Sequence, residues 1–147
     1  MAYAGRVVDD RLAEDKGKYR LPDGFKKSAV LFNLHRAKEH AGRGLIVVEG
    51  FFDCFRVHQA GFPNVVALMG SALSDDQERL LIEHTDRLDL MFDGDDAGTK
   101  CLREFYGRLR QRLYLREIRL DAGEQPDSLT EERIRKLTRG AFPLGGC

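Results

Sequence analysis

Acidic residues follow two strongly apolar segments of this chain. Glu49 comes directly after residues 45–48, and Asp93 and Asp95 come directly after residues 88–92. A carboxylate in such a place is costly to desolvate unless it is paired or binds a cation, and converging carboxylates repel one another. A hard divalent cation such as Mg²⁺ or Mn²⁺, which takes oxygen ligands, relieves that repulsion. The three acids therefore predict a metal site.

The chemistry that such a site supports is phosphoryl transfer. This reaction needs positioning and charge neutralisation more than it needs a protein nucleophile, so carboxylates and bound cations suffice. Magnesium keeps several waters and takes only one or two protein carboxylates besides substrate phosphates. The glycines beside the acids, Gly50 and Gly94, leave room for a phosphate or metal near the backbone. We therefore expect an open cradle rather than a closed metal cage.

Each acid also has a structural interpretation. Glu49 alone could lie at the start of a helix or pair with a buried arginine, and Asp93 and Asp95 could belong to a turn, where Asp and Gly are common. From Asp93 to Glu104 the sequence also matches positions 1, 3, 6 and 12 of an EF-hand calcium loop. However, position 5 is an alanine, and an apolar strand precedes the loop where an EF-hand needs a helix. A magnesium cradle is therefore favoured over a calcium loop.

Strand and helix patterns that would position these acids alternate from residue 28 onward. Strands are predicted at residues 45–48, 65–68, 88–92 and 114–120. Helices are predicted at residues 27–41, 52–60, 97–112 and 130–139, with a further helix opened by a capping box of Ser74 and Gln77. The fold class is therefore α/β, a mostly parallel central sheet covered by helices on both faces. In such sheets the ligand site lies beyond the carboxyl ends of the strands, where the acids fall.

Composition restricts the setting of the protein. The net charge is zero, with 24 basic and 24 acidic residues, but acids concentrate in residues 74–98 and bases in residues 99–119. Such charges are either solvated helix faces or a site that tolerates both cations and phosphates. The three cysteines form no CxxC pair, which indicates reduced cytoplasmic thiols rather than disulfides or zinc. No apolar run approaches the length of a membrane span, so we expect a cytoplasmic protein without a membrane partner.

The motifs carry a resemblance to a known family. Glu49-Gly50 after one apolar strand and Asp93-Gly94-Asp95 after another resemble the Toprim signature of primases, topoisomerases and several nucleases. The segments VVEGFFD, QAGF, VALMGSALS and FDGDDAG resemble bacterial DNA primases of the DnaG type, in the same order and at similar spacing. The resemblance covers roughly residues 18–130.

This resemblance implies roles for particular residues. Glu49, Asp93 and Asp95 are expected to be catalytic metal ligands, with Asp53 and Asp127 as further ligands. The family carries two aspartates around a proline where this chain has Gln125-Pro126-Asp127, so only Asp127 carries over as a metal ligand. The expected contacts to nucleotide or nucleic acid are Lys18, Lys27, Gly50, Gly70, Ser71, Lys100 and Arg103.

The resemblance also implies an activity and a domain organisation. It implies metal-dependent synthesis of RNA primers from nucleoside triphosphates on a single-stranded DNA template, with a replicative helicase as a partner through flanking domains. Residues 1–25 are expected to end a preceding subdomain and connect it to a Toprim catalytic domain at 26–140, followed by a tail at 141–147. We therefore expect the isolated chain to make little or no primer.

Other functions of the same fold stay open. A Toprim nuclease would use the same metal cradle. A topoisomerase would need a nucleophilic tyrosine, and none of the four tyrosines stands in a motif that marks one. A non-catalytic Toprim module that binds DNA, as a recombination mediator, would bind metal weakly and would not select triphosphates.

Overall fold

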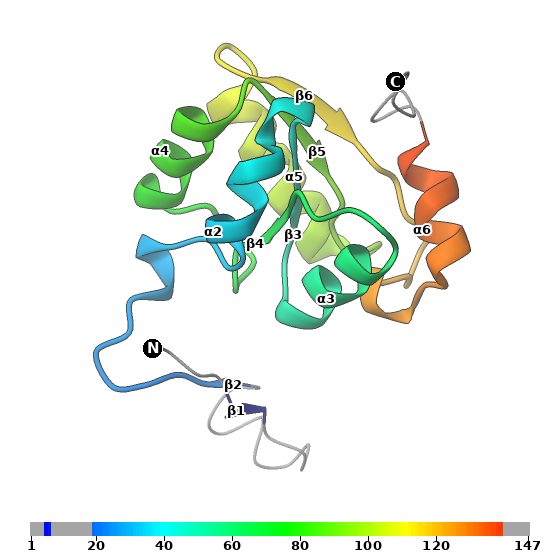
Figure 1. Ribbon diagram of the computed structural model, residues 1–147, viewed down its shortest axis with the longest axis horizontal. Helices are drawn as coiled ribbons and strands as arrows, with labels where there is room; N and C mark the ends of the chain where they lie inside the picture. Colours follow the sequence, from blue (N-terminus) through cyan, green and yellow to red (C-terminus); the bar gives the residue numbers. More distant parts are fainter. Residues whose placement is uncertain (1–4, 7–18, 140–147) are drawn as a thin grey trace.

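A four-stranded parallel sheet forms the centre of the molecule (Figure 1). The computed structural model describes residues 5–6 and 19–139. The strands lie in the order β4-β3-β5-β6, and every neighbouring pair is parallel. Their bounds are Leu45–Val48 for β3, Val65–Ala67 for β4, Arg87–Leu90 for β5 and Tyr114–Glu117 for β6. The predicted α/β class is confirmed, although three of the four strands are shorter than their apolar or alternating patterns.

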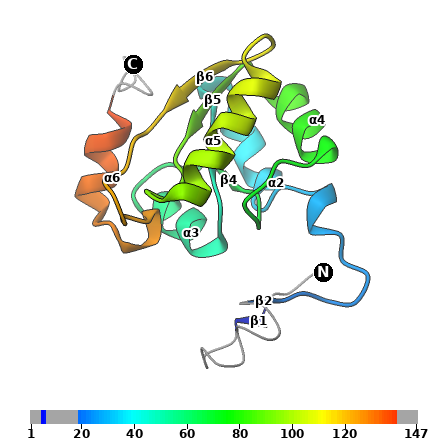
Figure 2. The ribbon, with the colours of Figure 1, turned by 180° about the vertical axis from the view of Figure 1, so that it is seen from behind.

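Helices cover both faces of this sheet (Figures 1 and 2). One core cluster joins alternate strand residues to α4 and α5, and a second joins the other residues of the strands to α3 and α6. In β3 all four residues are buried because successive side chains enter opposite clusters. The helices are α3 Phe51–Gln59, α4 Asp75–His84, α5 Asp96–Leu109 and α6 Glu131–Thr138.

The single helix predicted at residues 27–41 is wrong. A 3₁₀ turn, η1 (Lys27–Ala29), is followed by extended backbone, the short helix α2 (Leu34–Ala37) and a second 3₁₀ segment, η2 (Lys38–Arg43). Phe32 interrupts the helix because its N–H and C=O pair with those of Ala67, at 2.9 and 3.2 Å. This bridge covers the exposed edge of β4, so pairing of the sheet edge overrides the helical periodicity.

Predictions from helix-capping residues agree with the structure at α4 and α6. The Ser74 hydroxyl accepts a hydrogen bond from the Gln77 N–H at 3.1 Å, so the predicted capping box is confirmed. Thr130 caps α6 in the same way, through the N–H of Arg133. Near the N-terminus the short strands β1 (Gly5–Arg6) and β2 (Tyr19–Arg20) pair antiparallel.

No helix in the described part of the chain is both long and apolar enough to cross a membrane.

Helix α5 allows a test of the core by two substitutions of opposite effect. Phe105 is fully buried, and its ring lies 5.2 Å from that of Phe92. Phe105→Ala should therefore lower the free energy of unfolding by about 3–5 kcal/mol. At Gly107, two residues along, an added Cβ would meet nothing within 4 Å. Gly107→Ala should raise the free energy of unfolding by about 0.5–1 kcal/mol, because alanine loses less backbone entropy. Urea unfolding of both variants measures this, and a Gly107→Ala loss as large as that of Phe105→Ala would contradict the assigned faces of α5.

Candidate metal centre

The two central strands bring Glu49 and Asp93 together. Strands β3 and β5 are parallel neighbours, with Val47 paired to Leu90, so their carboxyl ends lie at the same edge of the sheet. The backbone N–H of Asp93 donates to Oε1 of Glu49 at 3.2 Å. The proximity of these two residues, which the sequence predicted from strand ends alone, is therefore present in the structure.

Asp53 joins helix α3 to the same cluster. Its side chain is only 8 % exposed. One carboxylate oxygen accepts the N–H of Gly50 at 2.9 Å, and the other accepts the N–H of Asp127 at 3.1 Å. The second bond brings the 3₁₀ turn η3 (Pro126–Ser128), which is distant in sequence, next to the start of α3. The Asp127 side chain itself is exposed.

Asp95 is the N-cap of helix α5. Its Oδ1 accepts the N–H of Gly98 at 2.8 Å, while the residue remains exposed. The neighbouring glycines are required by close backbone contacts. A Cβ on Gly94 would lie 2.1 Å from the carbonyl oxygen of Asp121, and one on Gly98 would lie 2.0 Å from that of Asp93. The aspartate and glycine residues of this loop therefore serve backbone packing as well as charge placement.

Burial and mutual repulsion raise the pKa values of the most enclosed acids. Burial raises the pKa of Glu49, the N–H of Asp93 lowers it, and the charges of Asp95 and Asp53 raise it further. Burial and the charge of Asp93 raise the pKa of Asp53 to about 6, against the opposing effect of the two N–H groups that it accepts. The carboxylates thus interact unfavourably, as predicted, and a bound cation would remove the penalty.

The side chains fit an open magnesium site better than a closed one. Within residues 5–6 and 19–139, no three side chains of His, Cys, Asp or Glu converge into a ready-made ligand set. Magnesium does not require such a set, because waters and substrate phosphates complete its octahedron. A pocket of about 400 Å³ adjoins the loop; Asp93 and Asp95 line it, whereas Glu49, Asp53 and Asp127 do not. The carboxylate donors, rather than this pocket, therefore make the site suited to a hydrated cation.

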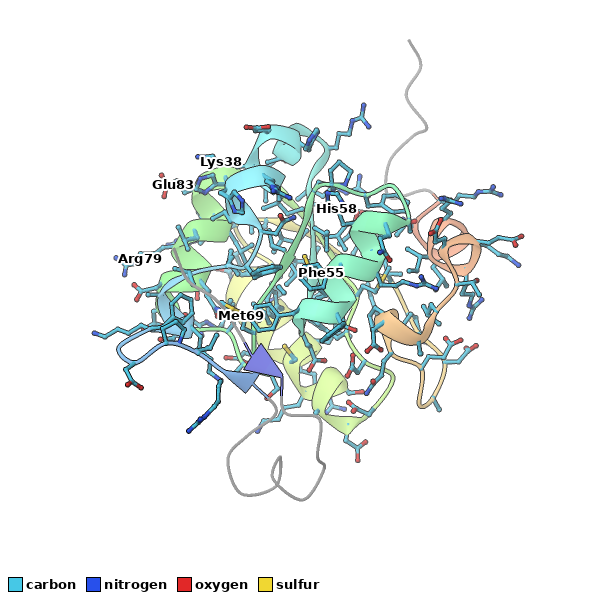
Figure 3. The ribbon with its side chains drawn as sticks, turned by 60° about the horizontal axis from the view of Figure 1, so that its bottom comes forward. Lys38, Phe55, His58, Met69, Arg79 and Glu83 are labelled. Carbon is cyan, nitrogen blue, oxygen red and sulfur yellow. The ribbon has the colours of Figure 1, made fainter. Side chains whose placement is uncertain are left out.

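Part of the predicted phosphate-binding set also lies at this end of the sheet. Met69, in the turn after β4, donates its N–H to the carbonyl oxygen of Glu49 at 2.8 Å; Figure 3, in which the bottom of Figure 1 comes forward, labels this residue. The next residue is Gly70, where an added Cβ would lie 3.9 Å from Nζ of Lys27. Ser71 is exposed in the same turn. The turn at Gly70 thus lies beside the side chain of Lys27 and is hydrogen-bonded, through Met69, to the backbone of Glu49.

The other predicted cations are less closely placed. Lys100 and Arg103 are exposed on α5, the helix that Asp95 caps. Lys18 lies outside the described residues. For these three residues the role in binding stays a prediction.

Comparison with known proteins identifies the family. A Toprim-like family model matches residues 46–130, which is more than half of the chain. This chain belongs to the Toprim-like family. The DNA primase of Clostridium acetobutylicum is 35% identical to this Toprim chain over 147 residues, covering 97% of the chain and 23% of the primase. The predicted relationship to primases of the DnaG type is confirmed.

Solved primase structures share the fold of the Toprim chain. The Aquifex aeolicus primase structure, of its zinc-binding and RNA polymerase domains, gives a TM-score of 0.78 at 35% identity, over 95% of this chain and 36% of that one. A DnaG primase catalytic domain bound to single-stranded DNA gives a TM-score of 0.72 at 31% identity, over 97% of this chain and 48% of that one. The Toprim chain therefore spans only a part of each of these proteins.

Sequence reasoning missed the groups that fix the turn after β4 in this Toprim domain. Arg108 of α5 donates to the carbonyl of Leu73 at 2.6 Å and to the carboxylates of Glu78 at 2.6 Å and Asp75 at 2.7 Å. Glu104 accepts the N–H of Leu73 at 3.4 Å. Part of the acidic and basic segregation is therefore structural, and Glu104 is not a calcium ligand in an EF-hand. Charge counting could not show these pairs because they join residues about thirty positions apart.

The raised pKa of Asp53 predicts a pH dependence of stability in the metal-free Toprim domain. Its pKa is about 6 in the folded protein and 3.8 ordinarily. Well below pH 3.8 Asp53 is protonated in both the folded and the unfolded state, and between pH 3.8 and 6 it is ionised in the unfolded state but still largely protonated in the folded state. Above pH 6 the ionised carboxylate should therefore cost the folded state about 3 kcal/mol.

This effect can be isolated by substitution. Asp53→Asn does not titrate, so in EDTA its free energy of unfolding relative to wild type should increase by about 2 kcal/mol between pH 4 and pH 7. Urea unfolding at each pH measures the difference. Asp96→Asn, at the exposed first residue of α5, is the control. A difference between wild type and Asp53→Asn that does not change with pH would contradict the prediction.

Proposed function

We propose that this chain is the catalytic Toprim domain of a DNA primase and that it catalyses metal-dependent nucleotidyl transfer on a single-stranded DNA template. The observation that carries the proposal is the acid cluster at the ends of β3 and β5. There the backbone N–H of Asp93 donates to the Glu49 carboxylate, and burial together with nearby charges raises the pKa of Glu49. The relatives are DNA primases, and one solved relative is bound to single-stranded DNA. These comparisons support the substrate class.

The chain spans 23% and 31% of the first two curated primases that it matches. The activity is therefore proposed for a polypeptide that also has the remaining parts of such a primase. With residues 26–140 as the catalytic domain, we expect weak or no primer synthesis from the chain by itself. Contact with a replicative helicase would involve those remaining parts.

Glu49, Asp93 and Asp95 are the proposed ligands of Mg²⁺ or Mn²⁺. Asp53 and Asp127 are proposed as further ligands, because Asp53 accepts the Asp127 N–H and so holds η3 against the cluster. Bound magnesium would neutralise phosphate charge and favour ionisation of the attacking 3′ hydroxyl. The protein contributes by holding the acids close together at the ends of the strands. Their mutual repulsion would then favour the binding of a cation.

The proposed phosphate contacts lie beside this cluster. Lys27 and the turn at Gly70 and Ser71 are proposed to bind a nucleoside triphosphate, since an ammonium group and an open glycine backbone both suit phosphate oxygens. Gly50 is proposed to present its backbone to the same phosphates, at a position where an added Cβ would lie 3.0 Å from Oδ2 of Asp53. Lys18, Lys100 and Arg103 are proposed to contact the phosphates of the triphosphate or of the template.

Removing two acids should strongly weaken metal binding. The Glu49→Gln, Asp93→Asn double variant keeps the shape of both side chains, so the N–H of Asp93 still finds an oxygen acceptor. Its affinity for Mn²⁺ should fall at least about tenfold, because two ligand charges are removed. Isothermal titration or water proton relaxation enhancement measures this, with Asp96→Asn as the control at an exposed acid. If the double variant binds Mn²⁺ as tightly as wild type, the metal assignment is wrong.

Charge reversal should test the interaction with single-stranded DNA. Lys27→Glu combined with Arg103→Glu should weaken binding of an oligonucleotide and flatten its salt dependence, by about 0.7 in the logarithmic slope for each phosphate that the variant no longer neutralises. Fluorescence anisotropy over a range of salt concentrations measures both quantities. Lys136→Glu on α6 reverses an exposed charge that the proposal does not use. Equal affinity and slope in the Lys27, Arg103 variant and wild type would remove these residues from the interface.

A further inference from the structure

Gln77 is a buried amide that joins three separate segments. It lies in the first turn of α4 and is 2 % exposed. Its side-chain nitrogen donates to the carbonyl oxygens of Lys27 at 3.3 Å, Val30 at 3.0 Å and Leu68 at 2.9 Å. Its side-chain oxygen accepts the N–H of Ser74 at 3.2 Å. Every polar atom of this buried side chain is therefore used.

Helix capping explains only one of these four contacts. In a capping box the third helical residue needs one oxygen that accepts the N–H of the cap residue, and glutamate serves as well as glutamine. Here the side-chain nitrogen of Gln77 faces three carbonyl oxygens. A glutamate at this position would place a carboxylate oxygen there instead, and that oxygen would repel the three carbonyl oxygens. The amide is therefore required by the contacts to the segment at residues 27–30 and to the end of β4.

The segment at η1 has few other means of attachment. None of the three residues of η1 is buried, so no core side chain anchors this turn. Besides the bonds from Gln77, the hydroxyl of Ser74 donates to the carbonyl oxygen of Ser28. The backbone of Lys27 is thus held from α4, while its side chain is exposed and its Nζ lies 3.9 Å from the Cβ position of Gly70.

The same amide also reaches the strand end that leads to the acid cluster. Leu68, whose carbonyl Gln77 binds, is followed by Met69, which donates its N–H to the Glu49 carbonyl. Met69 has a φ of 60°, a left-handed conformation that is uncommon for a residue other than glycine. One buried side chain therefore fixes both the backbone of Lys27 and the start of the turn that Lys27 faces.

We propose that Gln77 is a positioning residue, which holds Lys27 beside the Gly70 turn so that its ammonium group binds a phosphate of the nucleoside triphosphate. The inference rests on the proposed function, because it assigns a support to the proposed triphosphate contact. Gln77 itself touches no substrate. Its replacement should act on triphosphate binding through Lys27 and should leave the metal ligands unaffected.

The test is a double-mutant cycle on this chain. Wild type, Gln77→Met, Lys27→Met and the double variant are titrated with a fluorescent ATP analogue in saturating Mn²⁺, and with Mn²⁺ alone. Each single variant should lose about tenfold in ATP-analogue affinity, the typical effect of one hydrogen bond to a charged group. The double variant should lose no more than Lys27→Met, and Mn²⁺ affinity should not change.

A matched control separates positioning from general destabilisation. Asn64 is also a buried amide, 3 % exposed, and it donates to the Gly44 carbonyl at 2.9 Å at the opposite end of β4. Asn64→Leu should lower stability without changing affinity for the ATP analogue. If Gln77→Met does not fold, Ser74→Asp keeps the helix cap but removes the donor to Ser28. It should then weaken ATP-analogue binding in the wild-type background but not in the Lys27→Met background.

The outcomes distinguish the inference from the function on which it rests. If wild type does not bind the ATP analogue in the presence of Mn²⁺, the proposed function fails, and the inference fails with it. If Lys27→Met weakens binding while Gln77→Met, or Ser74→Asp in its place, does not, only the inference fails. Reductions in affinity from the two sites that add in the double variant would also overturn it, because Gln77 would then act independently of Lys27.

Discussion

The parallel pairing of β3 with β5 is the constraint on which the site depends. Both buried strands end at the same edge of the sheet, and the acids that follow them therefore lie close together. Burial and the neighbouring negative charges disfavour the ionised form of Glu49 and of nearby Asp53. The Asp93 N–H that binds Glu49 compensates part of this cost, and the two N–H groups that bind Asp53 compensate another part. The folded protein therefore keeps its acids close at a cost in stability that a cation would relieve.

A second layer of contacts holds the turns around that edge. The turn after β4 is fixed from α4 by Gln77 and from α5 by Arg108, whereas η3 is fixed by the carboxylate of Asp53. Gln77 and Arg108, which hold the turn after β4, come from helices on one face of the sheet. Asp53, which holds η3, comes from α3 on the other face. The geometry of the site thus requires both helical layers, which explains why a small cluster of acids needs an entire domain around it.

The sequence predicted what depends on local pattern and missed what depends on long-range contact. Buried strands, the Ser74 cap and the placement of Glu49 beside Asp93 follow from apolar runs, cap residues and the rule for parallel sheets. The helix at 27–41 was wrong because edge pairing by Phe32 cannot be read from periodicity. The place of Asp127 came only from the family resemblance, since its bond to Asp53 spans 74 residues. The contacts of Gln77 beyond its cap were equally invisible.

The close packing of Gly94 and Gly98 has a consequence for how this loop varies in evolution. Each glycine lies against a carbonyl oxygen so closely that even a methyl group would displace backbone, and Asp95 is retained by its bond to the start of α5. Selection for a folded domain alone would therefore preserve much of the aspartate and glycine pattern. A relative without catalytic activity would keep Gly94, Asp95 and Gly98, so these three positions mark ancestry more reliably than activity. Glu49 and Asp93 are acids that mutual repulsion disfavours, and they are the better indicators of retained chemistry.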